Sequence, residues 1–244
     1  MMLNTLLRPA RAAIVGASGG VGGALVASLA KAGFEAVHAL SRVPVAASTG
    51  VRPGHIDLLD EATIAAAATA LGEGAPLRLM IAATGLLHDA RTQPEKSMRS
   101  LDAAQLVRGF AVNTIGPALL AKHVVPLLPR AGRSVFAVLS ARVGSIEDNR
   151  LGGWYGYRAQ KAALNQIVRT LAVEVRRTRP EAIIVALHPG TVATDLSAPF
   201  RGAVSAERLF TPDVSARHLL DVIDGLTPDD SGGFFAWDGQ RIPF

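Results

Sequence analysis

The chain contains no cysteine, and only 5% of its 244 residues are aromatic. Without cysteine it can form no disulfide, use no thiolate nucleophile and bind no metal through sulfur, and we expect a cytoplasmic protein. Charged residues are also sparse, at 18%, whereas apolar residues make up 49%. This balance excludes global disorder and provides enough apolar side chains for a sizeable core.

Long hydrophobic runs are missing as well. No stretch reaches the roughly 18 uninterrupted apolar residues of a membrane-spanning helix, and the N-terminal run is interrupted by arginine and proline. The net charge is +5, but the arginines are scattered. Their densest group, residues 169–179, has the spacing of the solvated face and end of a helix rather than of a nucleic-acid patch. We therefore expect neither a membrane nor a nucleic acid as a partner.

Apolar, β-branched runs alternate with helical patterns along the whole chain. This alternation predicts βαβ units, and the continuous apolar strands are typical of a parallel sheet covered on both faces. With no repeat or linker, we expect one α/β domain over residues 1–244, a Rossmann-type doubly wound α/β/α sandwich with a mainly parallel sheet. The predicted strands are 12–17, 34–42, 77–85, 133–141, 182–190 and 232–239. The predicted helices are 20–33, 60–71, 101–128 with a break near Gly116-Pro117, and 155–177.

A glycine-rich turn, GASGGVG, lies between the first strand and the first helix. It places Gly16, Gly20 and Gly22 where glycine lets the main chain approach a pyrophosphate and where a helix N-terminus offers free N–H groups. Glycines also form ordinary tight turns. The position in a βαβ unit favours dinucleotide binding.

The end of the second strand indicates which dinucleotide binds. NAD sites carry an acidic residue there that accepts hydrogen bonds from the ribose. Here Ser41 takes that place and Arg42 follows. A guanidinium is suited to a 2′-phosphate, although a surface arginine in a loop is the alternative. We expect NADP(H) rather than NAD(H).

Tyr157 and Lys161 are four residues apart in the longest predicted helix and share one face, whereas Tyr155 has only an alanine at that offset. A phenol has a pKa of about 10. An ammonium about 4 Å away favours the phenolate by roughly 4 kcal/mol at an effective dielectric of about 20, or about three pKa units before desolvation opposes it. A tyrosine tuned in this way can exchange a proton with a carbonyl oxygen. An isolated YxxxK would be a half-buried tyrosine beside a solvated lysine.

With the glycine turn and the YxxxK pair in order along the chain, the sequence resembles the short-chain dehydrogenase/reductase family. Further motifs match: HIDLLD, AATG where the family has NNAG, FAVNTIGP, and HPGTVATD matching PGxxxT. The segments SARVGSIEDNRLGGWYGYR and FFAWDGQRIPF are similar to a narrower branch of C-factor-like signalling proteins and carbonyl reductases. The resemblance implies cofactor-binding roles for Gly16, Ser18, Gly20, Val21, Gly22, Ser41, Arg42, Asp57, Leu58, Ala83, Thr84, Gly85, Asn113, Tyr157, Lys161, Pro189, Gly190, Val192 and Thr194.

The same resemblance implies a catalytic set of Tyr157, Lys161 and Asn113 with a serine hydroxyl. The family's serine position holds Ala141, so we expect Ser140 to replace it, with Ser145 as the rival. Gln160 stands where the family has a serine before the lysine. No metal is expected.

The resemblance implies hydride transfer between NADP(H) and a small carbonyl compound or secondary alcohol, with Tyr157 as general acid/base. The alternative is a dinucleotide-binding signalling or sensor protein with little turnover. We expect the loop 196–210 to cover the substrate and a homo-oligomer to form through the long helices. Substrate identity stays open.

Overall fold

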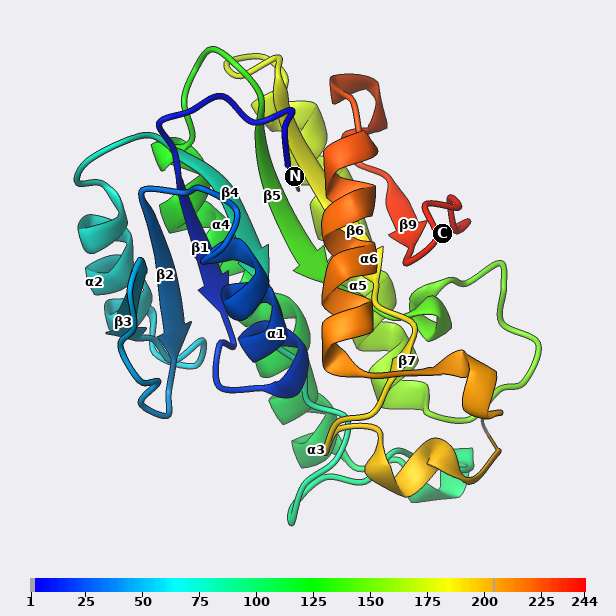
Figure 1. Cartoon of the computed structure of the whole chain (residues 1–244). Coiled ribbons are helices and arrows are strands. Elements are labelled where there is room, and N and C mark those ends of the chain that lie inside the picture. The colour runs from blue at the N-terminus through cyan, green and yellow to red at the C-terminus, as the bar shows by residue number, and fades with distance from the viewer. Residues whose placement is uncertain (1–2, 204) are drawn as a thin grey trace.

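The computed structural model describes residues 3–203 and 205–244. Seven strands form one parallel sheet in the order β3-β2-β1-β4-β5-β6-β9 (Figure 1). The order reverses between β1 and β4, which is the switch point where doubly wound sheets bind ligands. The strands are β1 (Arg11–Val15), β2 (Ala36–Ser41), β3 (Val51–His55), β4 (Leu77–Ala82), β5 (Ser134–Leu139), β6 (Ala182–His188) and β9 (Phe234–Ala236). A separate pair is formed by β7 (Thr191–Val192) and β8 (Leu209–Phe210).

Helices cover both faces of the sheet. In Figure 1, α1 (Gly20–Leu29) and α6 (Pro212–Gly225) lie in front of it and pack on each other. The opposite layer contains α2 (Glu61–Leu71), α4 (Gly116–Val124) and α5 (Tyr155–Val175), with α3 (Ala103–Phe110) leading into α4. These layers confirm the predicted sandwich.

Alternate residues of the central strands face the two helical layers. In β1, Val15 joins the core cluster that contains Leu120 of α4 and Leu164 of α5. Its neighbour Ile14 joins the cluster that contains Leu25 of α1. All residues of β1, β2, β4 and β5 are buried, which explains why these strands read as continuous apolar runs.

Besides the short pair β7 and β8, the strand β3 and the helix α6 were not predicted. β3 has the sequence VRPGH and buries only its first residue. Its arginine, proline and glycine read as a loop, and proline is tolerated because β3 pairs with β2 alone at the edge of the sheet. Helix α6 does carry start signals, since Thr211 caps it and Pro212 is its first residue.

The long third helix is interrupted one turn earlier than the predicted break. Residues Ala111–Ile115 form a π turn, and α4 starts at Gly116 directly after it. The ring of Pro117 would clash with the carbonyl of residue 113 in a regular helix, and the wider turn relieves this clash. Over Ala103–Leu127 this helix is long and apolar enough to cross a membrane by length and composition alone. Here Leu120 and Val124 of its inner side belong to the core.

A candidate active site at the carboxyl ends of the central strands

The glycine turn after β1 has a shape that only glycine permits. Gly16 has a φ of +87°, and a Cβ on it would lie 2.8 Å from the carbonyl oxygen of Ala83. A Cβ on Gly22 would lie 2.1 Å from the carbonyl oxygen of Gly16. Helix α1 then begins after Gly19, which has no side chain to cap it. The first N–H groups of α1 are therefore available to an anion.

Three segments that are far apart in sequence meet at this turn. A Cβ on Gly20 would lie 2.6 Å from Cγ2 of Thr194, so the turn touches the segment after β6. Thr84, after β4, lies against Gly16, and its buried Oγ1 has no hydrogen-bond partner in the part of the chain that the structure describes. A crowded cradle with an unpaired hydroxyl fits a dinucleotide.

The other expected cofactor residues lie around the same edge. Ser18 is exposed, Val21 is half-buried and Val192 is buried. The Pro189 carbonyl accepts a 2.9 Å hydrogen bond from Ser215 Oγ, and Gly190 has a φ of +77°. Gly85 lies near Asn113, because a Cβ on Gly85 would lie 3.8 Å from Oδ1 of Asn113.

The end of β2 adjoins the glycine turn, because the N–H groups of Gly16 and Ala17 donate to the carbonyl of Leu40 at 2.9 and 3.1 Å. Ser41 is buried and its hydroxyl donates to the carbonyl of Val43, whereas Arg42 is exposed. The exposed guanidinium of Arg42 therefore lies at this edge.

Asp57 and Leu58 follow β3 at the same edge of the sheet. The Asp57 carboxylate accepts a 3.0 Å bond from the N–H of Leu59. Leu58 packs against Gly116 at the start of α4. A Cβ on Gly116 would lie 2.6 Å from the Cβ of Leu58.

Tyr157 and Lys161 lie in the first two turns of α5. Lys161 is 2% exposed, and its Nζ donates a 2.8 Å hydrogen bond to the carbonyl of Leu139 at the end of β5. The same Nζ lies 5.7 Å from the centre of the Tyr157 ring. Tyr155 is 44% exposed and faces away from the core. The structure thus distinguishes the two tyrosines by burial.

The direction of the Tyr157 shift differs from the expectation. Burial raises the pKa of Tyr157, and burial lowers the pKa of Lys161 to about 8. The ammonium is bonded to Leu139 rather than to the phenol, so desolvation outweighs its attraction for a phenolate. In this structure Tyr157 is a protonated acid, beside a lysine that is still mostly charged at neutral pH.

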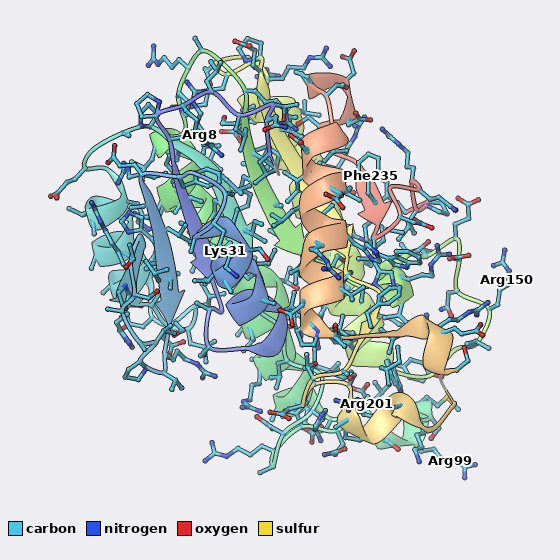
Figure 2. The ribbon with its side chains drawn as sticks, in the orientation of Figure 1. Arg8, Lys31, Arg99, Arg150, Arg201 and Phe235 are labelled. Carbon is cyan, nitrogen blue, oxygen red and sulfur yellow. The ribbon has the colours of Figure 1, made fainter. Side chains whose placement is uncertain are left out.

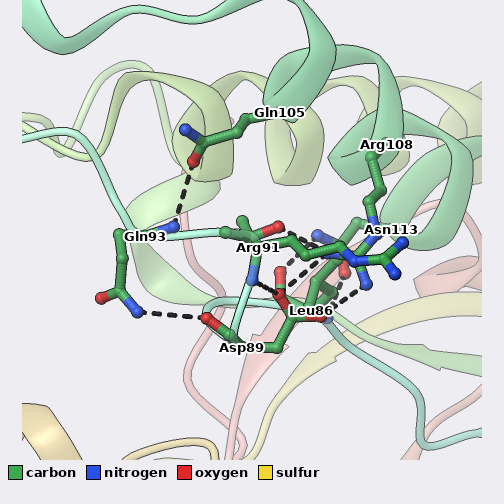
Figure 3. A network of polar contacts seen from close by, with 8 residues as sticks. Leu86, Asp89, Arg91, Gln93, Gln105, Arg108 and Asn113 are labelled. Atoms are coloured by element: carbon green, nitrogen blue, oxygen red, sulfur yellow. Dashed lines mark hydrogen bonds and ion pairs between the residues drawn. The ribbon is translucent and has the colours of Figure 1, made fainter.

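Asn113 lies in the π turn and is 1% exposed. Its Oδ1 accepts from the N–H of Leu86 at 2.8 Å, and its Nδ2 donates to the carbonyl of Leu86 and to Oε1 of Gln160, both at 2.7 Å. Figure 3 shows Asn113 beside Leu86, next to the ion pair of Asp89 and Arg108. The loop after β4 is thereby tied to the helix that carries Asn113.

Both candidate serines, Ser140 directly after β5 and Ser145 on the loop that follows, are buried. Ser140 Oγ donates a 2.7 Å hydrogen bond to Oδ1 of Asn165, which lies two turns beyond Tyr157 in α5. Ser145 is 1% exposed, and its Oγ accepts a 3.0 Å bond from the N–H of Asp148. The two hydroxyls are therefore engaged in different ways.

An aromatic cluster beside Tyr157 was missed by sequence reasoning. The Trp154 ring makes edge contacts with Tyr157 at 6.3 Å and with Phe200 at 5.0 Å, and Phe200 contacts His88 at 5.5 Å. Trp154 has a φ of +52°, unusual for a large side chain. The pair Gly152-Gly153 directly before Trp154 is the sequence feature that could have indicated this unusual backbone conformation.

Glu95 was also missed. It is 7% exposed, and its Oε2 accepts a 3.0 Å bond from the N–H of Gly156, so a distant loop caps the helix that carries Tyr157. Nothing in the sequence near Glu95 indicates its partner.

Across residues 3–203 and 205–244, no group of three or more metal-binding side chains occurs. The labelled arginines Arg8, Arg99, Arg150 and Arg201 lie at separate places (Figure 2).

Comparison with known proteins identifies the family of this chain and several relatives. A family model described as short chain dehydrogenase matches residues 10–204, and the chain belongs to this family. C-signal of Myxococcus xanthus is 38% identical over 149 residues, covering 61% of this chain and 84% of that protein. The 1-hydroxy-2-glutathionyl-2-methyl-3-butene dehydrogenase of Rhodococcus sp. (strain AD45) is 33% identical over 197 residues, 81% of each chain.

A solved structure extends this likeness to the whole fold. An NADPH-bound carbonyl reductase from chicken fatty liver has a TM-score of 0.84 at 28% identity, covering 99% of this chain and 96% of that one. These relatives confirm the C-factor-like and carbonyl-reductase-like branch expected from the sequence.

Proposed function

We propose that this protein is an NADP(H)-dependent oxidoreductase that interconverts a carbonyl compound and a secondary alcohol, with Tyr157 as the general acid/base. The observation that carries the proposal is the pair formed by Tyr157 and the buried Lys161 at the end of β5, on the sheet edge that also holds the glycine turn. The bound nicotinamide supplies or accepts the hydride.

The residues of this chain manage the proton and the orientation of the substrate. Tyr157 holds a proton at its phenol oxygen and gives it to the oxygen of the reduced carbonyl. The nearby Lys161 ammonium stabilises the phenolate that remains. Asn113 holds a water through which the proton is replaced, and Ser140 polarises the carbonyl. The aromatic side chains of Trp154 and Phe200 form an apolar wall beside Tyr157, which is suited to an apolar substrate.

The experiment that tests the proposal compares the two tyrosines. Tyr157→Phe removes the acid and should abolish reduction of a carbonyl panel by NADPH, while NADPH binding measured by fluorescence titration survives. Tyr155→Phe should keep most of the activity, because Tyr155 is exposed and has no lysine one turn away. Equal loss of activity in both variants would contradict the assignment.

The NADPH-bound relative supports NADP(H) as the cofactor, and Arg42 provides a reason for the preference. Arg42→Ala should weaken NADPH binding by roughly 1.5–3 kcal/mol, the scale of a charge-assisted hydrogen bond, and leave NADH binding nearly unchanged. Arg52→Ala is the matched control, because Arg52 is exposed on β3 but pairs with His38, away from the carboxyl ends of the strands. Calorimetric dissociation constants that favour NADH in the parent protein would refute the preference.

A second candidate is a dinucleotide-binding signalling protein with little turnover. The 38% identity to C-signal favours it, whereas the half-buried Tyr157 beside the buried Lys161 favours an enzyme. The two differ in one observable: the signalling protein would bind NADPH without reducing any compound of the panel.

A further inference from the structure

Gln160 is a buried side chain beside the proposed catalytic pair with no part in the chemistry described above. It directly precedes Lys161 in α5 and is 5% exposed. Its Oε1 accepts a 2.7 Å hydrogen bond from Nδ2 of Asn113, and its main-chain carbonyl accepts a 2.9 Å bond from Oγ1 of Thr114. One residue of α5 therefore binds two consecutive residues of the π turn.

Two glycines make room for this side chain. A Cβ on Gly109 of α3 would lie 2.1 Å from Nε2 of Gln160, and a Cβ on Gly156 would lie 3.2 Å from the same atom. Glycine inside a helix costs about 1 kcal/mol relative to alanine, and neither residue has a positive φ. The absence of a side chain at Gly109 is explained by the space that Gln160 occupies.

The hydrogen bonds of Asn113 show what Gln160 holds. A carboxamide has two N–H donors, and those of Asn113 bind the carbonyl of Leu86 and Gln160 Oε1. Its Oδ1 accepts from the N–H of Leu86 (Figure 3). Both donors and one of the two acceptor positions of Oδ1 are therefore used inside the protein, so the side chain serves as an anchor for the π turn.

The relay water proposed above is placed on the main-chain carbonyl of Asn113, which lacks the donor that a regular α-helix would give it. In a regular α-helix its hydrogen-bond donor would be the N–H four residues later. That residue is Pro117, which has no N–H. The position of this carbonyl relative to α5 is set by the contacts between the π turn and α5, and the two hydrogen bonds to Gln160 bridge them.

We propose that Gln160 is a positioning residue for proton delivery: it fixes the π turn on α5 so that the carbonyl of Asn113 keeps its place relative to Tyr157 and Lys161. This inference rests on the proposed function. It assigns to Gln160 an effect on the proton step, with no contact to substrate or cofactor.

The test uses the full-length chain with NADPH and 4-nitrobenzaldehyde as the probe. Gln160→Met keeps the length of the side chain and removes the acceptor for Asn113, and it should lower kcat by about tenfold with KM and NADPH affinity within about twofold. The ratio of kcat in H₂O to kcat in D₂O should rise, because proton delivery becomes slower. Gln160→Glu keeps an oxygen acceptor and should stay closer to the parent kcat. Gln166→Met, at an exposed position of the same helix, should behave like the parent.

A second readout does not depend on turnover. Amide hydrogen exchange over residues 110–116 should be faster in Gln160→Met and unchanged in Gln166→Met. A parent protein that never reduces the probe but shows this difference would refute the proposed function and leave the anchoring intact. A folded Gln160→Met with the parent's kcat, isotope ratio and exchange would overturn the inference. If Gln160→Met does not fold, a Gln160→Glu variant that loses as much kcat as a truncating Gln160→Ser would overturn it too.

Discussion

Ser140 and Ser145 differ in what their hydroxyl protons can do. Ser140 donates its single proton to Asn165, so it must give up that bond to donate to a substrate oxygen. Asn165 lies eight residues beyond Tyr157, about 12 Å further along the axis of α5. Ser145 accepts from Asp148 and keeps its proton, but it is 1% exposed. To polarise a carbonyl, Ser140 must therefore release Asn165, whereas Ser145 has its proton available but must be reached by the substrate.

The pair of serine variants decides between the two hydroxyls. Losing one preorganised donor to a developing oxyanion typically costs about 10²–10³ in kcat. If Ser140 polarises the carbonyl, as we propose, Ser140→Ala should lower kcat by that factor in steady-state assays, with NADPH affinity unchanged. Ser145→Ala should then cost less than about tenfold. A larger loss in Ser145→Ala would transfer the role to Ser145, and no loss in either variant would leave Tyr157 to polarise the carbonyl alone.

Single residues were predictable where a local pattern carries the chemistry. The four-residue spacing of Tyr157 and Lys161 is local, and the structure places the two side chains next to each other, with Lys161 buried and Tyr157 half-buried. Gln160 was noticed only as a departure from a motif, because its partner Asn113 lies 47 residues away. The pKa direction of Tyr157 could not be predicted either, since it depends on how far the fold desolvates the phenol and on the bond between Lys161 and Leu139.

At the scale of elements, the sequence predicted the strands that are buried on both faces and missed the exposed edge strand β3 as well as the short pair β7 and β8. β3 buries a single residue and is held by its pairing with β2, so tertiary pairing rather than local preference defines it. The π turn depends on a local feature, Pro117, but the sequence alone placed the interruption at the proline. The start of α5 shows the same limit, because its cap comes from Glu95, 61 residues earlier.

At the scale of the whole molecule, the buried His38 and the half-buried His188 make the stability of the fold depend on pH. His38 in β2 and His188 at the end of β6 both have their pKa lowered from 6.5 to about 4, mainly by burial. Arg11 and Arg52 act in the same direction on His38, and Arg142 does so on His188, where Asp238 partly opposes it. Both rings are therefore neutral in the folded protein near neutral pH.

The sign of the effect follows from proton uptake. Between pH 6.5 and about 4 the unfolded chain binds a proton at each histidine that the folded chain does not bind, so the free energy of unfolding decreases as the pH falls through this window. By pH 5 the loss is about 2 kcal/mol for each ring. Asp89 acts in a separate window, because its pKa is lowered from 3.8 by Arg108 and its contribution is lost only below that value.

Urea denaturation at pH 7 and pH 5 tests this prediction. The parent protein should lose about 4 kcal/mol between these pH values from the two histidines together. His38→Gln removes one titrating ring, so its loss should be about 2 kcal/mol smaller, whatever its stability at pH 7. His55→Gln is the control, because His55 lies on β3 opposite Ser41 with its side chain exposed, and it should keep the slope of the parent. If His38→Gln has the same slope as the parent, His38 is protonated in the folded state at pH 5, and the acid sensitivity of the molecule must come from other groups.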